Sequence, residues 1–208
     1  SDTFNYVVQD ADNLEDTGKV SITVASVNEP PSAQNLNFSV EQGETLNGQL
    51  KASDPDGDKL TYAQSTEPSN GQLSINADGS FSYTSQEDFL GQDSFEYLVK
   101  DTEDQQTKAN VQIEVYTPAQ AGDQNVSTDE DSTLHANFEI YNPSDLDYST
   151  EVITQAEHGE VELSSGNFQY KPEKNYNGAD SFEYQLTDSK DNTSKASVQI
   201  EVKEVNDP

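Results

Sequence analysis

The chain has 208 residues, of which 31% are hydrophobic, and its 40 acidic residues against ten basic ones give a formal net charge of −30. So acidic a chain repels nucleic-acid phosphates and anionic lipid, which excludes both as favourable partners, and it attracts cations. Cysteine is absent, which excludes disulfides and thiolate metal sites. The sequence contains no run of 18 apolar residues, so direct membrane insertion is not expected. The alternative to cation binding is an acidic coat that only keeps the protein in solution.

Residues 1–31 come first and contain a phrase that returns twice. SDTFNYVVQD at the start matches DSFEYLVKD from Asp93 and DSFEYQLTD from Asp180, while VSITV from Val20 matches VQIEV from Val111 and from Val198. We therefore expect residues 1–31 to be the last two strands and the linker of a preceding, truncated repeat. An isolated two-stranded hairpin is marginal in water. The prediction is that it packs loosely or pairs with another copy of the chain.

Two whole units follow, predicted at residues 32–118 and 119–208. Within each unit apolar residues alternate with polar ones, as in DSFEYLV, which is the period of a half-buried strand, and turn signals such as DPDGD recur between the strands. About seven short strands in about 90 residues predict an all-β fold of antiparallel Greek-key β-sandwiches. The tyrosines that repeat between the copies are expected to fill the sandwiches; they are Tyr62, Tyr83, Tyr97, Tyr170 and Tyr184.

Several motifs occur in a fixed order across the chain. They are VNEPP from Val27, DPDGDKLTY from Asp54, NGQL from Asn70, DGSFSYTS from Asp78 and FLGQDSFEYLVKD from Phe89. Together they resemble the cadherin-like, immunoglobulin-like tandem repeats of large secreted calcium-dependent bacterial adhesins, such as RTX-type surface proteins, over all 208 residues. The resemblance implies tandem Greek-key sandwiches at the bacterial cell surface, with calcium as the cofactor. It also implies that neighbouring repeats of the same polypeptide are partners, and that the protein serves in cell adhesion or biofilm formation.

A first calcium site is expected where residues 1–31 meet the first unit, which we call the first joint. DPDGD does not open an EF-hand, because Lys59 stands where glycine is required and Ser65 stands where a bidentate glutamate belongs. The resemblance instead implies that two loops, the linker and the preceding domain meet at one pole of the sandwich. The expected ligands are Asp2, Asn28, Glu29, Asp54, Asp56 and Asp101. The alternative is that Asp-Pro-Asp-Gly is only a solvent-facing turn.

A second site is expected between the two units, at the second joint, with a poorer set of ligands. The expected ligands are Glu87, Asp88, Asp93, Asp145, Asp147 and Asp188. Ala119 and Gln120 occupy the linker positions that Asn28 and Glu29 hold at the first joint. We therefore expect a weaker, partial or absent ion here and a joint that bends more. Asn206 and Asp207 restore the linker ligands for a joint with a further domain.

Other chemistry has little support in the sequence. His158 stands in a turn whose first copy is Asn70, and no nucleophile elbow or other catalytic motif is present, so the chain is not expected to be an enzyme. The alternative to a stalk is direct binding of polysaccharide, with Tyr141, Tyr148 or Tyr176 stacking on a sugar ring, or calcium-dependent self-association. A glycan array with and without chelator separates these possibilities from a stalk.

Overall fold

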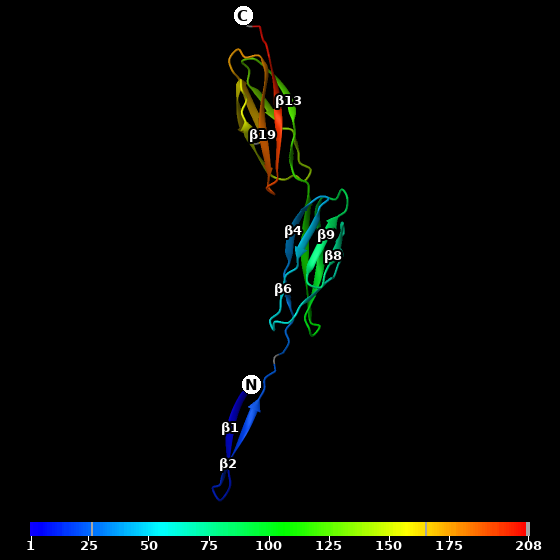
Figure 1. Ribbon diagram of the computed structural model, residues 1–208, viewed down its shortest axis with the longest axis vertical. Coiled ribbons are helices and arrows are strands. Elements are labelled where there is room, and N and C mark those ends of the chain that lie inside the picture. The colour runs from blue at the N-terminus through cyan, green and yellow to red at the C-terminus, as the bar shows by residue number, and fades with distance from the viewer. Residues whose placement is uncertain (26, 165, 207–208) are drawn as a thin grey trace.

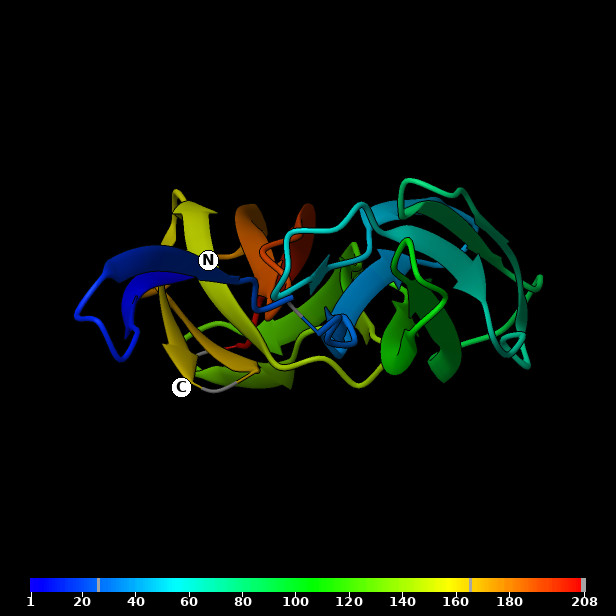
Figure 2. The same ribbon diagram turned by 90° about the horizontal axis from the view of Figure 1, so that it is seen from below.

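The structure, a computed structural model, describes the chain except residues 26, 165, 207 and 208. Its described residues form strands joined by turns, so the expectation of an all-β fold is confirmed. A hairpin and two sandwiches follow one another along the long axis (Figure 1), and the end-on view shows that the two sandwiches are offset from each other (Figure 2). Among the described residues there is no helix that could cross a lipid bilayer. Asp207, predicted to serve a further joint, lies outside the described residues.

The N-terminal hairpin consists of β1 (Asp2–Gln9) and β2 (Glu15–Ile22), paired from Asp2↔Ile22 to Gln9↔Glu15. It forms a two-stranded sheet of its own, and every residue of β1 is exposed. Phe4 and Tyr6, whose counterparts in the complete units are buried, are 54% and 48% exposed. The hairpin thus presents an apolar face that no other described segment covers. Its assignment to a preceding repeat, and the boundaries of all three units, stay predictions.

The first sandwich contains nine strands in two main sheets. One sheet has the order β4-β11-β10-β7, the other has the order β5-β9-β8, and β3 pairs with β6. The strands are β3 (Ser32–Ala33), β4 (Leu36–Glu41), β5 (Thr45–Gln49), β6 (Ala52–Ser53), β7 (Thr61–Gln64), β8 (Gly71–Ile75), β9 (Ser80–Ser85), β10 (Gly91–Lys100) and β11 (Gln106–Tyr116). Alternate residues of β10 and β11 point into the core, where Phe95 and Val111 are almost fully buried.

The second sandwich repeats this arrangement. Its sheets have the orders β13-β20-β19-β16 and β14-β18-β17, with β12 paired to β15. The strands are β12 (Gln120–Ala121), β13 (Gln124–Asp129), β14 (Leu134–Asn137), β15 (Ile140–Tyr141), β16 (Tyr148–Thr154), β17 (Gly159–Ser164), β18 (Asn167–Pro172), β19 (Gly178–Asp188) and β20 (Thr193–Lys203). Its core is separate from the first and is built around Phe168, Phe182 and Val198.

One feature of the sheets differs from the expected antiparallel sandwich. β4 runs parallel to β11, and β13 runs parallel to β20. The reason is that the linker enters each sandwich at the pole where the final strand begins, after the turn at Asp101 or Asp188. Two strands that start at one pole and lie side by side must run in the same direction.

The repeated tyrosines fill the sandwiches as predicted. Tyr83, Tyr97, Tyr170 and Tyr184 are fully buried, while Tyr62 is half-buried and stacks on Tyr97. A buried hydroxyl needs a hydrogen-bond partner. The Tyr97 hydroxyl lies 2.6 and 2.9 Å from the carbonyl oxygens of Gln34 and Lys51, so it joins β10 to the backbone beside β3 and β6. Tyr184 does the same in the second sandwich through Gly122 and Glu139.

Candidate functional site

The first joint gathers acidic and amide side chains where the linker meets the first sandwich. Asn28 Nδ2 donates a hydrogen bond of 2.8 Å to Asp101 Oδ2, and Gln105 Nε2 donates one of 2.8 Å to the Asn28 carbonyl oxygen. The Glu29 backbone N–H donates to Asp56 Oδ2 at 2.8 Å. The linker is therefore tied to both loops of this pole, the loop between β6 and β7 and the turn between β10 and β11.

Short-range hydrogen bonds shape these two loops. Asp54 Oδ1 accepts from the backbone N–H groups of Asp56 and Asp58 at 2.9 and 3.2 Å. Asp101 Oδ1 accepts from those of Glu103 and Gln105 at 2.9 and 2.8 Å. Aspartate favours such turns because its side chain can bond to the backbone two residues further on. Each loop thus holds its first aspartate in a fixed orientation.

The second carboxylate oxygen of Asp54 is the unusual atom of this site. Within the described part of the chain, Asp54 Oδ2 is buried and has no hydrogen-bond partner. Leaving a buried charged oxygen without a partner costs about 1–3 kcal/mol or more. A cation would satisfy it, and the surrounding donors are carboxylate and amide oxygens, which are the ligands that Ca²⁺ prefers. The donor set therefore fits calcium.

Asp101 stays ionised at this pole. Burial acts to raise the pKa of Asp101, but hydrogen bonds from the Asn28 side chain and from the backbone of Glu103 and Gln105 outweigh it. The pKa of Asp101 is therefore lower than its usual value. Asp101 therefore carries a negative charge at neutral pH, and both of its oxygens accept hydrogen bonds from protein donors.

The expected ligand set is only partly assembled. Asn28, Glu29, Asp54, Asp56 and Asp101 lie at one pole, whereas Asp2 is exposed on the hairpin and its side chain accepts from the Thr3 backbone N–H. Across the residues that the structure describes, no three or more His, Cys, Asp or Glu side chains are arranged so that they could hold a metal ion as they stand. The assignment of calcium ligands stays a prediction at both joints.

At the second joint a backbone group takes the place of Asn28. Asp188, the counterpart of Asp101, is 4% exposed, and its Oδ2 accepts from the Ala119 backbone N–H at 3.2 Å. Its Oδ1 accepts from the backbone N–H groups of Lys190 and Asn192 at 2.9 and 3.0 Å. Burial acts to raise the pKa of Asp188, but these hydrogen bonds hold it lower than usual. The oxygens of Asp188 are thus already used by protein donors.

Of the other residues predicted for the second joint, Asp145 and Asp147 lie in a loop that contacts the Asp188 turn, because the Ser189 backbone N–H donates to the Asp147 carbonyl oxygen at 2.8 Å. Glu87 and Asp88 are exposed in the loop before β10, and Asp145 and Asp147 are exposed in the loop before β16. Asp93 is buried, and its two oxygens accept from the backbone N–H groups of Ser69, Asn70 and Ser94 and from the Tyr83 hydroxyl. Asp93 therefore holds the turn before β8, and its oxygens are not free at the joint.

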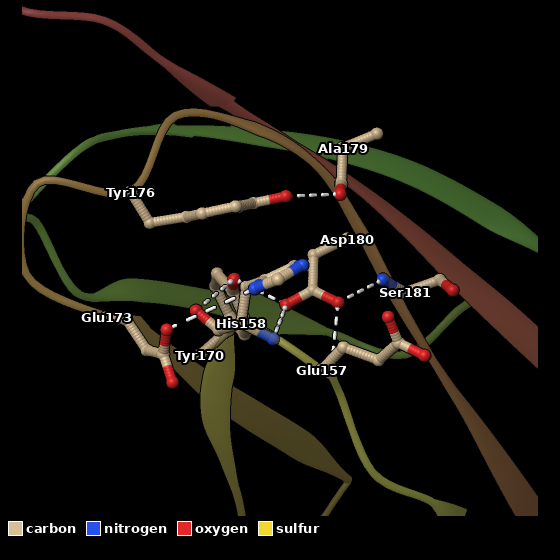
Figure 3. Close-up of polar contacts among 8 residues, drawn as sticks. All are labelled: Glu157, His158, Tyr170, Glu173, Tyr176, Ala179, Asp180 and Ser181. Carbon is tan, nitrogen blue, oxygen red and sulfur yellow. Dashed lines mark hydrogen bonds and ion pairs between the residues drawn. The ribbon is translucent and has the colours of Figure 1, made fainter.

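The same buried clamp recurs at Asp180 in the second sandwich (Figure 3). Asp180 accepts from the backbone N–H groups of Glu157 and His158 at 3.0 Å, from that of Ser181 at 2.8 Å and from the Tyr170 hydroxyl at 2.8 Å. His158 is a turn residue, as predicted, and its ring stacks on Tyr176 with centroids 4.2 Å apart. The sequence carries a signal for this clamp, because tyrosine precedes aspartate by ten residues in both units.

Comparison with known proteins places the fold. A family described as "Bacterial Ig domain" matches residues 28–114 and again residues 117–201. The extracellular cadherin domains 3–6 of protocadherin gamma B2 are 11% identical with a TM-score of 0.52, covering 99% of this chain and 58% of that one. The human desmocollin-1 ectodomain is 11% identical with a TM-score of 0.51, covering 98% and 48%. These likenesses show the fold alone.

Other matches do not add to this. An endo-fucoidan hydrolase from glycoside hydrolase family 107 is 16% identical with a TM-score of 0.37, and the match covers 99% of this chain but 35% of that one. The chain thus spans between about a third and three fifths of the length of these three solved structures. Among curated proteins, none matches the sequence.

Proposed function

Because the chain belongs to the bacterial Ig domain family, we propose that it is an extender segment in the stalk of a large bacterial surface or extracellular adhesin of the RTX type, which serves cell adhesion or biofilm formation. Two sandwiches of the same strand order follow one another along the long axis, which is the arrangement that a spacer needs (Figure 1). Domains of this family are typically non-catalytic. The role that we propose is therefore mechanical and not enzymatic.

The buried Asp54 Oδ2 without a partner carries the second part of the proposal, that calcium stiffens the first joint. The ligands would be Asp54, Asp56 and Asp101 from the sandwich, Asn28 and Glu29 from the linker, and Asp2 from the hairpin. Calcium supplies a double positive charge that offsets the mutual repulsion of these carboxylates. A ligand shared by hairpin and sandwich would restrict the bending of the linker.

The absence of cysteine makes the first joint easy to label. Spin labels at Ser21→Cys on β2 and Ser74→Cys on β8, both exposed positions, report the distance between the hairpin and the first sandwich. We expect millimolar calcium to narrow the distance distribution and an equal concentration of magnesium to leave it broad, because magnesium loses its water reluctantly. Asp54→Ala should abolish the effect, and the matched variant Asp145→Ala in the second unit should preserve it.

Two results would contradict the calcium proposal. One is a distribution that does not change with calcium, and the other is a calcium response that Asp54→Ala leaves intact. Isothermal titration of the same variants in 0.15 M salt adds a second readout. At this ionic strength diffuse attraction to the acidic surface is screened beyond about 8 Å, so the remaining heat reports a specific site.

Direct binding of polysaccharide is the second candidate function, and one surface favours it. Tyr141 and Tyr148 are exposed near an open hollow of about 670 Å³, which is lined by Tyr148 together with Asn142, Asp145, Asp147 and Ser149. An exposed ring beside polar groups can stack on a sugar. A glycan array probed in calcium and in chelator tests this function. Binding to a glycan that is lost in Tyr148→Ala would support this function. An array without signal would argue against sugar binding and leave the stalk role as the remaining candidate. Sedimentation in calcium would detect self-association, which neither the stalk role nor sugar binding requires.

A further inference from the structure

We propose that Lys190 is a built-in cation that fixes the second joint without calcium. The hydrogen bonds given above for the first joint link carboxylates with amide groups, whereas the second joint has a side-chain ammonium group at the seam between the sandwiches. This inference does not depend on calcium binding at the first joint. It concerns the contacts across the second joint alone.

Lys190 reaches from the second sandwich to the end of the first. Its ammonium group pairs with the Glu114 carboxylate near the end of β11, and it lies 5.5 Å from the centroid of the Tyr116 ring. The side chains of Lys190 and Glu114 are 26% and 39% exposed, and Tyr116 is 9% exposed. A fully exposed ion pair contributes little to stability. Partial burial and the cation–π contact strengthen this one.

The linker is held on both sides of the same seam. The Thr117 backbone N–H donates to Ser144 Oγ in the second sandwich at 2.8 Å, and the Thr117 hydroxyl lies 3.3 Å from Gln42 Oε1 in the first. The Ala119 backbone N–H donates to Asp188, and Ala119 is fully buried. These contacts restrict the linker at two successive points, so rotation about it would break several of them together.

The first joint has the same backbone but different side chains. The N–H groups of Glu103 and Lys190 lie at the same distance, 2.9 Å, from Asp101 and Asp188, and the residues that follow them have φ angles of 65° and 64°. Equivalent turns therefore present glutamate at one joint and lysine at the other. Thr23 and Ala25 stand where the second joint has Glu114 and Tyr116. Both partners of Lys190 are thus missing at the first joint.

The consequence is an array with two kinds of joint. The expectation of a more mobile second joint rested on the loss of the linker ligands Asn28 and Glu29. The contacts of Lys190, Thr117 and Ala119 argue for the opposite, a joint that stays in place whether or not calcium is present. Calcium would then restrict bending between the hairpin unit and the first sandwich and leave the joint between the two sandwiches unchanged.

Spin labels at Ser74→Cys on β8 and Glu162→Cys on β17, both exposed, report the second joint in the intact chain. In chelator we expect a narrow distance distribution that calcium does not change. Lys190→Glu should broaden it by about a factor of two or more, because repulsion from Glu114 replaces attraction. The charge-swapped double variant, Glu114→Lys with Lys190→Glu, should return the distribution most of the way to its narrow wild-type width. Lys195→Glu, the same charge change at an exposed position of β20, is the matched control and should have no effect.

Either of two outcomes overturns the proposal: a wild-type distribution that is broad in chelator and narrows only in calcium, or a width that Lys190→Glu leaves unchanged. Circular dichroism of each variant verifies that both sandwiches remain folded. Labels at residues 21 and 74 report the first joint separately. A failure of the calcium proposal is therefore visible there and does not alter the result at the second joint.

Discussion

Replacing Asp180 by asparagine tests the buried clamp of the second sandwich in isolation. Asp180 is 7% exposed and accepts four hydrogen bonds from four different residues (Figure 3). Asparagine keeps the shape of the side chain but turns one acceptor oxygen into a donor NH₂ group, which faces donors in the clamp. Two charge-assisted hydrogen bonds at about 1.5–3 kcal/mol each are lost, so the expected loss in free energy of unfolding is about 3–6 kcal/mol.

The assay must distinguish one sandwich from the other, because their cores are separate. Hydrogen exchange followed by mass spectrometry across a urea series does this peptide by peptide. Asp180→Asn should lower the urea midpoint of peptides from β16 to β20 and leave those from β7 to β11 in place, and Asp93→Asn should do the reverse. Glu160→Gln, an exposed change on β17, is the control and should stay within about 0.5 kcal/mol of wild type. If Asp180→Asn also changes the free energy of unfolding by no more than about 0.5 kcal/mol, the clamp does not stabilise the second sandwich.

Three further predictions follow from the same contacts. The pKa values of Asp101, Asp180 and Asp188 are lower in the folded chain than the usual aspartate value of 3.8, so their stabilising contribution is present at neutral pH. It is lost as pH falls below 3.8 and through the lowered values. Melting temperatures should therefore drop in this acidic range, and a flat profile would contradict this. Gly159→Ala should destabilise the second sandwich by about 1–3 kcal/mol in urea unfolding, because a Cβ there would lie 2.3 Å from Tyr170 Cε2; a neutral result would mean that the ring moves aside freely. Amides of β1 in the monomeric chain should exchange much faster than those of β11, since β1 belongs to a two-stranded sheet with an uncovered face; equal protection would mean that the hairpin is stable by itself.

Much of the fold could be predicted from the sequence because its determinants are local or repeated. Alternation of apolar and polar residues with a period of two identifies strands such as β10 and β11, and turn residues mark their ends. The internal repeat adds the register between copies. It identified Tyr83 and Tyr170 as equivalent core residues, and both are fully buried.

The roles of the aspartates were decided by the tertiary structure. Asp93 and Asp101 both recur in each unit, and the sequence placed both at joints. Asp93 instead faces inward because the backbone N–H groups of Ser69 and Asn70, more than twenty residues earlier, converge on it. The contact of Lys190 with Glu114 joins residues 76 positions apart and exists only where two sandwiches meet. Composition and periodicity describe one strand at a time, whereas the partner of a charged side chain depends on which distant segments the packing of the sheets brings beside it.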